Sequence, residues 1–99
     1  IRMKFLESIK IKIAISRITK MEKIFDDLKF SFEKSKEEFY RKKNLQKKLK
    51  ALTNYYENGK WLKDYQLDEE NLLPKNLKRG ILSQDGIYNF LREVENREV

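Results

Sequence analysis

The chain contains no cysteine and no histidine among its 99 residues. Without cysteine no disulfide can form, which excludes a small secreted disulfide scaffold. The two absences also remove the usual ligands of zinc and other transition metals, and the Ser-His and Cys-His catalytic pairs. An enzyme would have to use Asp, Glu, Lys, Tyr or Ser alone. We therefore expect no catalytic site, no metal site and no cofactor.

Helix-breaking residues and long apolar runs are also scarce. Three glycines and one proline favour helices, because both residue types destabilise helix interiors. No apolar run reaches the length of about 18 residues that a membrane-spanning helix requires. Lysines and Arg17 interrupt the apolar stretches before Met21, so we expect no signal peptide and a cytoplasmic protein.

Charge is what the chain has in abundance. There are 23 basic and 16 acidic residues, a net charge of +7, and 39% of all residues are charged. This balance favours an elongated helical protein with a large surface relative to its core. A basic protein can bind nucleic acid, acidic proteins or anionic membranes; the alternative is a surface that is basic only for solubility.

A heptad pattern begins at Ala14. Its positions, spaced alternately by four and three, are Ala14, Ile18, Met21, Phe25, Leu28, Phe32, Ser35 and Phe39. The pattern predicts a coiled-coil-like seam on a long helix over about residues 8–41, with Ser35 its weak position. Between the seam positions, a solvated face is predicted for Lys20, Glu22, Lys23, Asp26, Asp27 and Lys29. Residues 1–13 read as an N-terminal extension; a basic helix lying on a membrane is the alternative, but a membrane partner is not expected.

Three shorter helices are predicted after the long one. Leu45, Leu49, Leu52 and Tyr56 start a new register, which places a helix over about 45–57 and a chain reversal over 41–44; a single bent helix is the alternative. Asn58-Gly59 ends that helix. A short helix over about 61–70 and a C-terminal helix over about 84–97, capped by Ser83, complete a single domain over 14–99. The fold class is all-α, an elongated hairpin or bundle in which two to three shorter helices pack on one long N-terminal helix. An uncovered seam would favour a homodimer.

Aromatic residues gather near the middle of the chain, at Tyr55, Tyr56, Trp61 and Tyr65. They fit a core where helices meet, with the hydroxyls and the indole N–H reaching polar partners. The functional alternative is an exposed anchor for a protein partner, since Trp and Tyr dominate interface energetics.

Two charged clusters are further candidates. The basic segment 34–50 holds Arg41, Lys42, Lys43, Lys47 and Lys48, which either form a solvated face or contact phosphates. Acidic residues gather at Asp64, Asp68, Glu69 and Glu70. Carboxylates can bind Mg²⁺ or Ca²⁺, but the spacing of an EF-hand loop is missing. We expect Asp64 and Asp68 instead to hold Lys78 or Arg79 of the basic loop 75–79.

Several stretches resemble one family of small bacterial proteins. They are Arg-Ile-Thr-Lys-Met-Glu-Lys-Ile-Phe-Asp (17–26), Tyr-Tyr-Glu-Asn-Gly-Lys-Trp-Leu-Lys-Asp-Tyr (55–65), Asp68-Glu69, and Leu-Pro-Lys-Asn-Leu-Lys-Arg-Gly-Ile-Leu-Ser-Gln-Asp (73–85). The chain resembles the family called domain of unknown function 4298. The resemblance implies a small, mostly helical bacterial domain, and it implies no activity.

The sequence predicts a non-catalytic protein–protein interaction module, an adaptor, inhibitor or chaperone-like partner of bacterial or mobile-element origin. Three features favour it: an apolar stripe that Ile24 and Phe30 widen beyond the strict seam, the aromatic cluster, and the lack of catalytic residues. The alternative is nucleic-acid binding through the basic segment 34–50.

Overall fold

The computed structural model describes residues 2–96 of the chain, with side chains described from Leu6 onward. This part of the protein is helical and contains no strand. Its elements, in order, are α1 (Arg2–Lys34), α2 (Lys36–Arg41), α3 (Lys43–Glu57), α4 (Lys60–Glu69), the 3₁₀ turn η1 (Gly80–Leu82) and α5 (Gln84–Glu95). The prediction of an all-α fold is confirmed.

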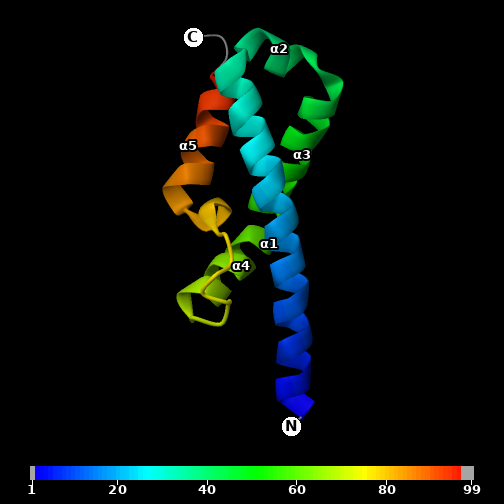
Figure 1. The fold of residues 1–99 in the computed structure, drawn as a ribbon, viewed down its shortest axis with the longest axis vertical. Helices are drawn as coiled ribbons and strands as arrows, with labels where there is room; N and C mark the ends of the chain where they lie inside the picture. Colours follow the sequence, from blue (N-terminus) through cyan, green and yellow to red (C-terminus); the bar gives the residue numbers. More distant parts are fainter. Residues whose placement is uncertain (1, 97–99) are drawn as a thin grey trace.

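The long helix α1 organises the molecule, which measures 53 × 25 × 23 Å along its principal axes. Helix α2 turns the chain over at the end of α1, and α3 returns antiparallel beside it (Figure 1). Helix α4 continues past the end of α3, and α5 then runs back along the upper part of α1 (Figure 1). The elongated bundle built on one N-terminal helix is therefore confirmed.

The predicted helix over 8–41 is not continuous. It begins at Arg2 and breaks at Ser35, whose backbone is extended (φ −160°, ψ 108°) and whose hydroxyl accepts a hydrogen bond from the Glu38 amide at 3.3 Å. Serine competes for backbone hydrogen bonds in this way and so favours the N-cap over the helix interior. The weak seam position is thus the point where α1 ends and α2 begins.

The chain turns again at Lys42, inside the predicted reversal over 41–44. The alternative prediction, a single bent helix across this segment, is wrong. Helices α3 and α4 begin within two residues of their expected starts, and Gly59 between them adopts a left-handed conformation (φ 92°). Such a backbone favours glycine, because it has no Cβ. Helix α5 ends at Glu95, and residue 97 of its predicted range lies outside the described residues. The turn η1 was not predicted.

The core is built from the heptad seam and the helices that cover it. Phe25, Phe32, Phe39 and Phe90 pack edge to face, with ring centroids 5.1 Å apart for Phe32–Phe39 and 5.6 Å for Phe25–Phe90. Apart from half-buried Met21 and Ser35, the seam is buried within one chain. The predicted basis for a homodimer, an uncovered seam, is therefore absent from the described residues.

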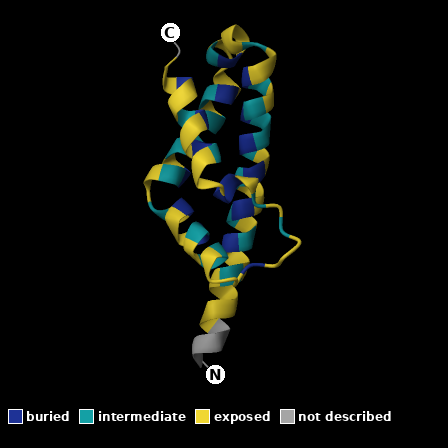
Figure 2. Cartoon of the chain, turned by 90° about the vertical axis from the view of Figure 1, so that its left-hand side faces the viewer, coloured by how far each residue is buried: buried dark blue, intermediate teal, exposed yellow. Residues whose placement is uncertain are grey.

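The first turns of α1 extend beyond the rest of the bundle. Residues 2–13, expected as a separate extension, continue α1 without a break. Leu6, Ile9 and Ile13 remain 50%, 39% and 55% exposed on this part of the helix, and the turns from Leu6 to Ile13 are mostly exposed (Figure 2). None of the described helices combines the length and the apolar character that a membrane crossing requires.

We predict that Ser35→Ala lowers the free energy of unfolding by about 1 kcal/mol, because α2 loses its N-cap hydrogen bond. The measurement is urea unfolding followed by circular dichroism. Ser35→Asp keeps a capping oxygen and should stay within a few tenths of a kcal/mol of the wild type. Equal losses in the two variants would show that the cap does not stabilise the break.

Candidate interaction site

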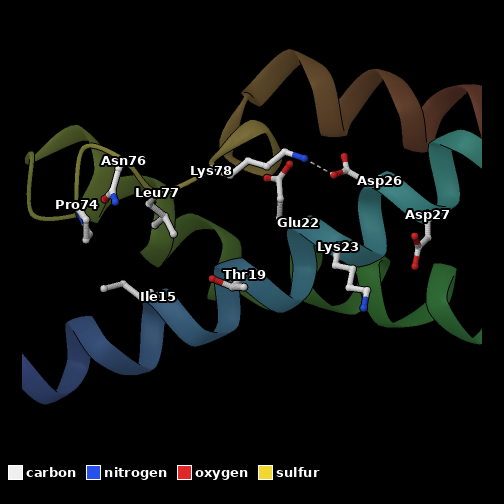
Figure 3. Close-up of a pocket in the computed structure, with 10 residues that line it drawn as sticks. All are labelled: Ile15, Thr19, Glu22, Lys23, Asp26, Asp27, Pro74, Asn76, Leu77 and Lys78. Carbon is white, nitrogen blue, oxygen red and sulfur yellow. Dashed lines mark hydrogen bonds and ion pairs between the residues drawn. The ribbon is translucent and has the colours of Figure 1, made fainter.

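A groove of about 640 Å³ lies between α1 and the Pro74 loop, which we define as residues 70–79 (Figure 3). Ile15 of α1 and Pro74 and Leu77 of the loop supply its apolar side chains. Its polar lining residues are Thr19, Glu22, Lys23, Asp26, Asp27, Asn76 and Lys78. A hollow of this size with a mixed lining can receive side chains of a partner.

The Pro74 loop is held in place by its own polar contacts. The Arg79 guanidinium pairs with the Asp68 carboxylate of α4 and donates to the backbone oxygens of Pro74 and, at 3.2 Å, Leu77. The Lys78 ammonium donates to Asp26 Oδ2 of α1 at 2.6 Å, and Leu73 is buried in the core. A segment without regular structure is thereby fixed against two helices.

Glu22 fixes the end of the same loop. Its side chain is 5% exposed, and Oε1 accepts a hydrogen bond from the Ile81 amide of η1 at 2.7 Å. A Cβ at Gly80 would lie only 3.1 Å from Glu22 Oε2, so glycine permits this close approach. Glu22 was predicted on a solvated face, and that prediction is wrong, because the turn η1 covers this position.

A second buried carboxylate joins three helices. Asp64 of α4 is 0% exposed. Arg17 of α1 donates to both its oxygens, from Nε to Oδ2 at 2.9 Å and from Nη2 to Oδ1, and the Tyr55 hydroxyl of α3 donates to Oδ2 at 2.7 Å. A buried charge requires such a partner and such hydrogen bonds. The arrangement is structural, since its atoms are occupied by one another.

Burial and the hydrogen bond to Asp64 raise the pKa of the Tyr55 hydroxyl. Loss of the proton would place a second negative charge beside the carboxylate. The hydrogen bond to Asp64 also raises the pKa of Arg17. Both groups therefore keep their protons at neutral pH.

The aromatic cluster divides between core and surface. Tyr55 and Trp61 are only 4% and 5% exposed, and the Trp61 indole N–H donates to the Ile81 oxygen at 2.8 Å. Tyr65, which is half-buried, stacks on Trp61 with ring centroids 5.1 Å apart, and Tyr56 meets its edge at 5.2 Å. The expected core position is confirmed for Tyr55 and Trp61, and the alternative of these two residues as exposed partner anchors is wrong, because both rings fill the space where α3, α4 and η1 meet.

The basic segment 34–50 lies around α2 and the first turns of α3. Glu38 forms two ion pairs, from Oε1 to Arg41 Nη2 at 3.6 Å and from Oε2 to Lys42 Nζ at 3.9 Å. Lys48 Nζ lies 3.1 Å from Asp27 Oδ2. Lys43 and Lys47 are exposed on α3. Phe39, the aromatic residue in the middle of this segment, is buried and cannot stack on a base.

The acidic cluster does not act as one unit. The predicted pairing of Asp68 with Arg79 is confirmed, and Ser83 caps α5 by accepting from the Gly86 amide at 3.2 Å. The pairing of Asp64 with the basic loop is wrong, because Asp64 points to Arg17, and Lys78 binds Asp26 instead. Between residues 6 and 96, no group of three or more carboxylates is placed to hold a metal ion.

Sequence reasoning missed Arg17, Glu22 and Asp26 as structural partners. Glu22 carried a usable signal, since it follows Ile18 by four residues and precedes Phe25 by three, on the side of the helix that faces the core. Arg17 and Asp26 carried none, because their partners lie 47 and 52 residues away.

A comparison with protein families matches most of the chain, including most of the residues described above. The family model described as domain of unknown function (DUF4298) matches residues 18–98. The chain belongs to this family. The segment that matches the DUF4298 model includes Glu22, Asp64 and the whole Pro74 loop. Arg17 lies one residue before this segment. No curated protein and no solved structure matches the chain.

Removing the buried carboxylate should destabilise the fold strongly. We predict that Asp64→Ala lowers the free energy of unfolding by about 3–5 kcal/mol, since Arg17 loses its buried partner. The matched control is Asp68→Ala, which breaks an Arg–carboxylate pair whose side chains are 26–30% exposed and should lose about 1 kcal/mol or less. Urea unfolding measures both, and similar losses would contradict the role of Asp64.

Alkaline pH should weaken the same network. Below about pH 10 the tyrosine is protonated in both states; above it the unfolded chain releases the proton while folded Tyr55 retains it. The stability that Tyr55 provides should then fall by up to about 1.4 kcal/mol per pH unit. Unfolding of the wild type and Tyr55→Phe from about pH 9 to pH 11 measures this; a constant difference between the two proteins would contradict it.

Proposed function

We propose that this chain is a non-catalytic protein–protein interaction module of the bacterial cytoplasm, and that the partner binds in the groove between α1 and the Pro74 loop. The observation that carries the proposal is the fixed loop itself. Its anchors at Asp26, Asp68 and the core hold Pro74 and Leu77 opposite Ile15.

A fixed loop favours binding because little conformational entropy is lost when a partner arrives. The groove has apolar side chains towards one end and charged side chains towards the other (Figure 3), and interfaces between proteins combine both kinds of contact. Loops held on a rigid scaffold often carry function, and this one contains the Leu-Pro-Lys-Asn-Leu-Lys-Arg sequence (73–79). The groove thus replaces Trp61 and Tyr55 as the expected contact.

The alternative function is nucleic-acid binding through the basic segment 34–50. One observation supports it: Lys43, Lys47 and Lys50 are exposed at spacings of four and three on α3, and none lies within ion-pair distance of a carboxylate in the described part of the chain. Lysines on one helix face can contact phosphates. The pairing of Arg41, Lys42 and Lys48 with carboxylates makes this function second.

We predict that Thr19→Arg abolishes partner capture without unfolding the domain. Thr19 is exposed on α1 and lines the groove, so a longer, charged side chain fills the hollow while the core remains intact. The measurement is a tagged pull-down from the source organism, treated with nuclease and analysed by mass spectrometry. Asn89→Arg, an exposed position on α5, is the matched control and should capture the partner at wild-type yield.

The outcomes separate the two functions. If Lys43→Glu with Lys47→Glu leaves capture unchanged and Thr19→Arg removes it, the groove is the contact. A catch of nucleoprotein that disappears with nuclease, and that the double lysine variant abolishes, would replace the proposal with nucleic-acid binding. If Thr19→Arg captured the partner at wild-type yield, the groove at the Pro74 loop would be rejected as the binding site.

A further inference from the structure

A second concave surface lies elsewhere on α1, and none of its lining residues lines the groove described above. It consists of two hollows of about 510 and 390 Å³, the first between α1, α3 and α4 and the second between α1 and α4. Both are lined by Ile13 and Arg17, which makes them neighbours along α1. We call this surface the Ile13 groove.

The Ile13 groove is strongly basic. Its lining includes Lys10, Arg17, Lys20, Lys60 and Lys63, and one acidic residue, Glu70. Arg17 is neutralised by Asp64. The four lysines have no carboxylate within 4.0 Å among the described residues. The surface therefore keeps a local excess of positive charge that the chain does not satisfy.

An aliphatic stripe begins at Ile13 and continues along α1 beyond the two hollows. Ile13 is 55% exposed, and Ile9 and Leu6 follow it towards the N-terminus at helical spacings of four and three, 39% and 50% exposed. Figure 2 shows the first described turns of α1 extending beyond the bundle. From Leu6 to Lys20 the surface extends over about 21 Å of helix, the length of about four helical turns.

We propose that the Ile13 groove binds an acidic amphipathic helix of a partner protein. Aliphatic side chains of that helix pack on Ile13, Ile9 and Leu6, and its Asp and Glu side chains face the lysines at the rim. An amphipathic helix laid in a groove is a common form of peptide recognition, and opposite charges on the two surfaces direct the association.

The lining favours this occupant over nucleic acid or a membrane. Single strands stack on exposed aromatic rings, and the aromatic ring at this surface, Tyr55, is 4% exposed. A lipid surface is flat, whereas the site is hollowed between α1 and α4. Lys10, Ile13 and Arg17 all precede residue 18, where the family match begins, so this surface includes a part of the chain outside that match.

The test uses the whole chain and a synthetic probe. The probe is a fluorescein-labelled peptide of about 18 residues, slightly longer than the groove, with leucines on one helical face and glutamates on the other. Two control peptides have the same composition in scrambled order, or lysine in place of glutamate. Fluorescence anisotropy should show saturable binding of the acidic amphipathic peptide, weakening with added salt, and at least tenfold weaker binding of both controls.

Variants locate the binding on the surface. Ile13→Asp should weaken binding of the acidic amphipathic peptide at least tenfold. The double variant Lys20→Glu with Lys63→Glu should weaken it to the same extent. The matched controls are Phe30→Asp, an exposed apolar position near the other end of α1, and Lys43→Glu with Lys47→Glu, which changes the net charge equally. Both controls should keep binding within about twofold of the wild type once circular dichroism confirms the fold.

Three results would overturn the proposal. One is no binding of the acidic amphipathic peptide. Another is equal binding of the scrambled peptide or equal loss in the control variants, which would show attraction by net charge alone. The third is tighter binding of a single-stranded oligonucleotide or of phosphatidylglycerol vesicles that Ile13→Asp abolishes, which would assign the surface to that ligand instead. Thr19→Arg should bind the probe like the wild type, so this test is independent of the groove at the Pro74 loop.

Discussion

The arrangement of the helices depends on the hydrogen bonds and the ion pair that the buried Asp64 carboxylate makes. This carboxylate is fully buried and holds Arg17 of α1 and Tyr55 of α3 from its place on α4. A charge in this position is tolerated only with well-placed partners, so the three helices can meet in few other ways. Glu22 makes the corresponding contact between α1 and η1. Two buried acids thus fix the shorter elements along the long helix.

The candidate surfaces follow from these two contacts. Glu22 and the core fix the end of the Pro74 loop, and the remaining loop contacts hold it beside α1 as one wall of a groove. Elsewhere on α1, the Arg17–Asp64 pair brings α4 against the helix and leaves the lysines around Ile13 facing outward. Both surfaces are shaped by the same helix, one with a mixed lining of both charges and the other with a mainly basic lining. The chain belongs to the DUF4298 family, and the description of that family assigns no activity.

Sequence periodicity predicted most of the fold but only part of the site. The seam from Ala14 to Phe39 is largely buried, and α3, α4 and α5 lie close to their expected ranges. The break at Ser35 was visible only as a weak seam position, because a serine can lie in a helix or cap one. The expectation that Asp68 holds Lys78 or Arg79 is confirmed for Arg79. Asp64 was assigned to the wrong partner, because the chain offers 23 basic residues and spacing alone does not select one of them.

Residue spacing along the chain is sufficient to predict the helical class, the approximate helix ranges and the apolar faces that form the core. These depend on residues three and four positions apart, and such neighbours are fixed by the helix geometry. Tertiary structure decided which carboxylates are buried, which lysines remain unpaired, and that Trp61 lies inside the molecule. Those outcomes depend on how helices distant in sequence approach one another. The candidate surfaces belong to this second group, since each is formed by α1 together with segments 30 or more residues further along the chain.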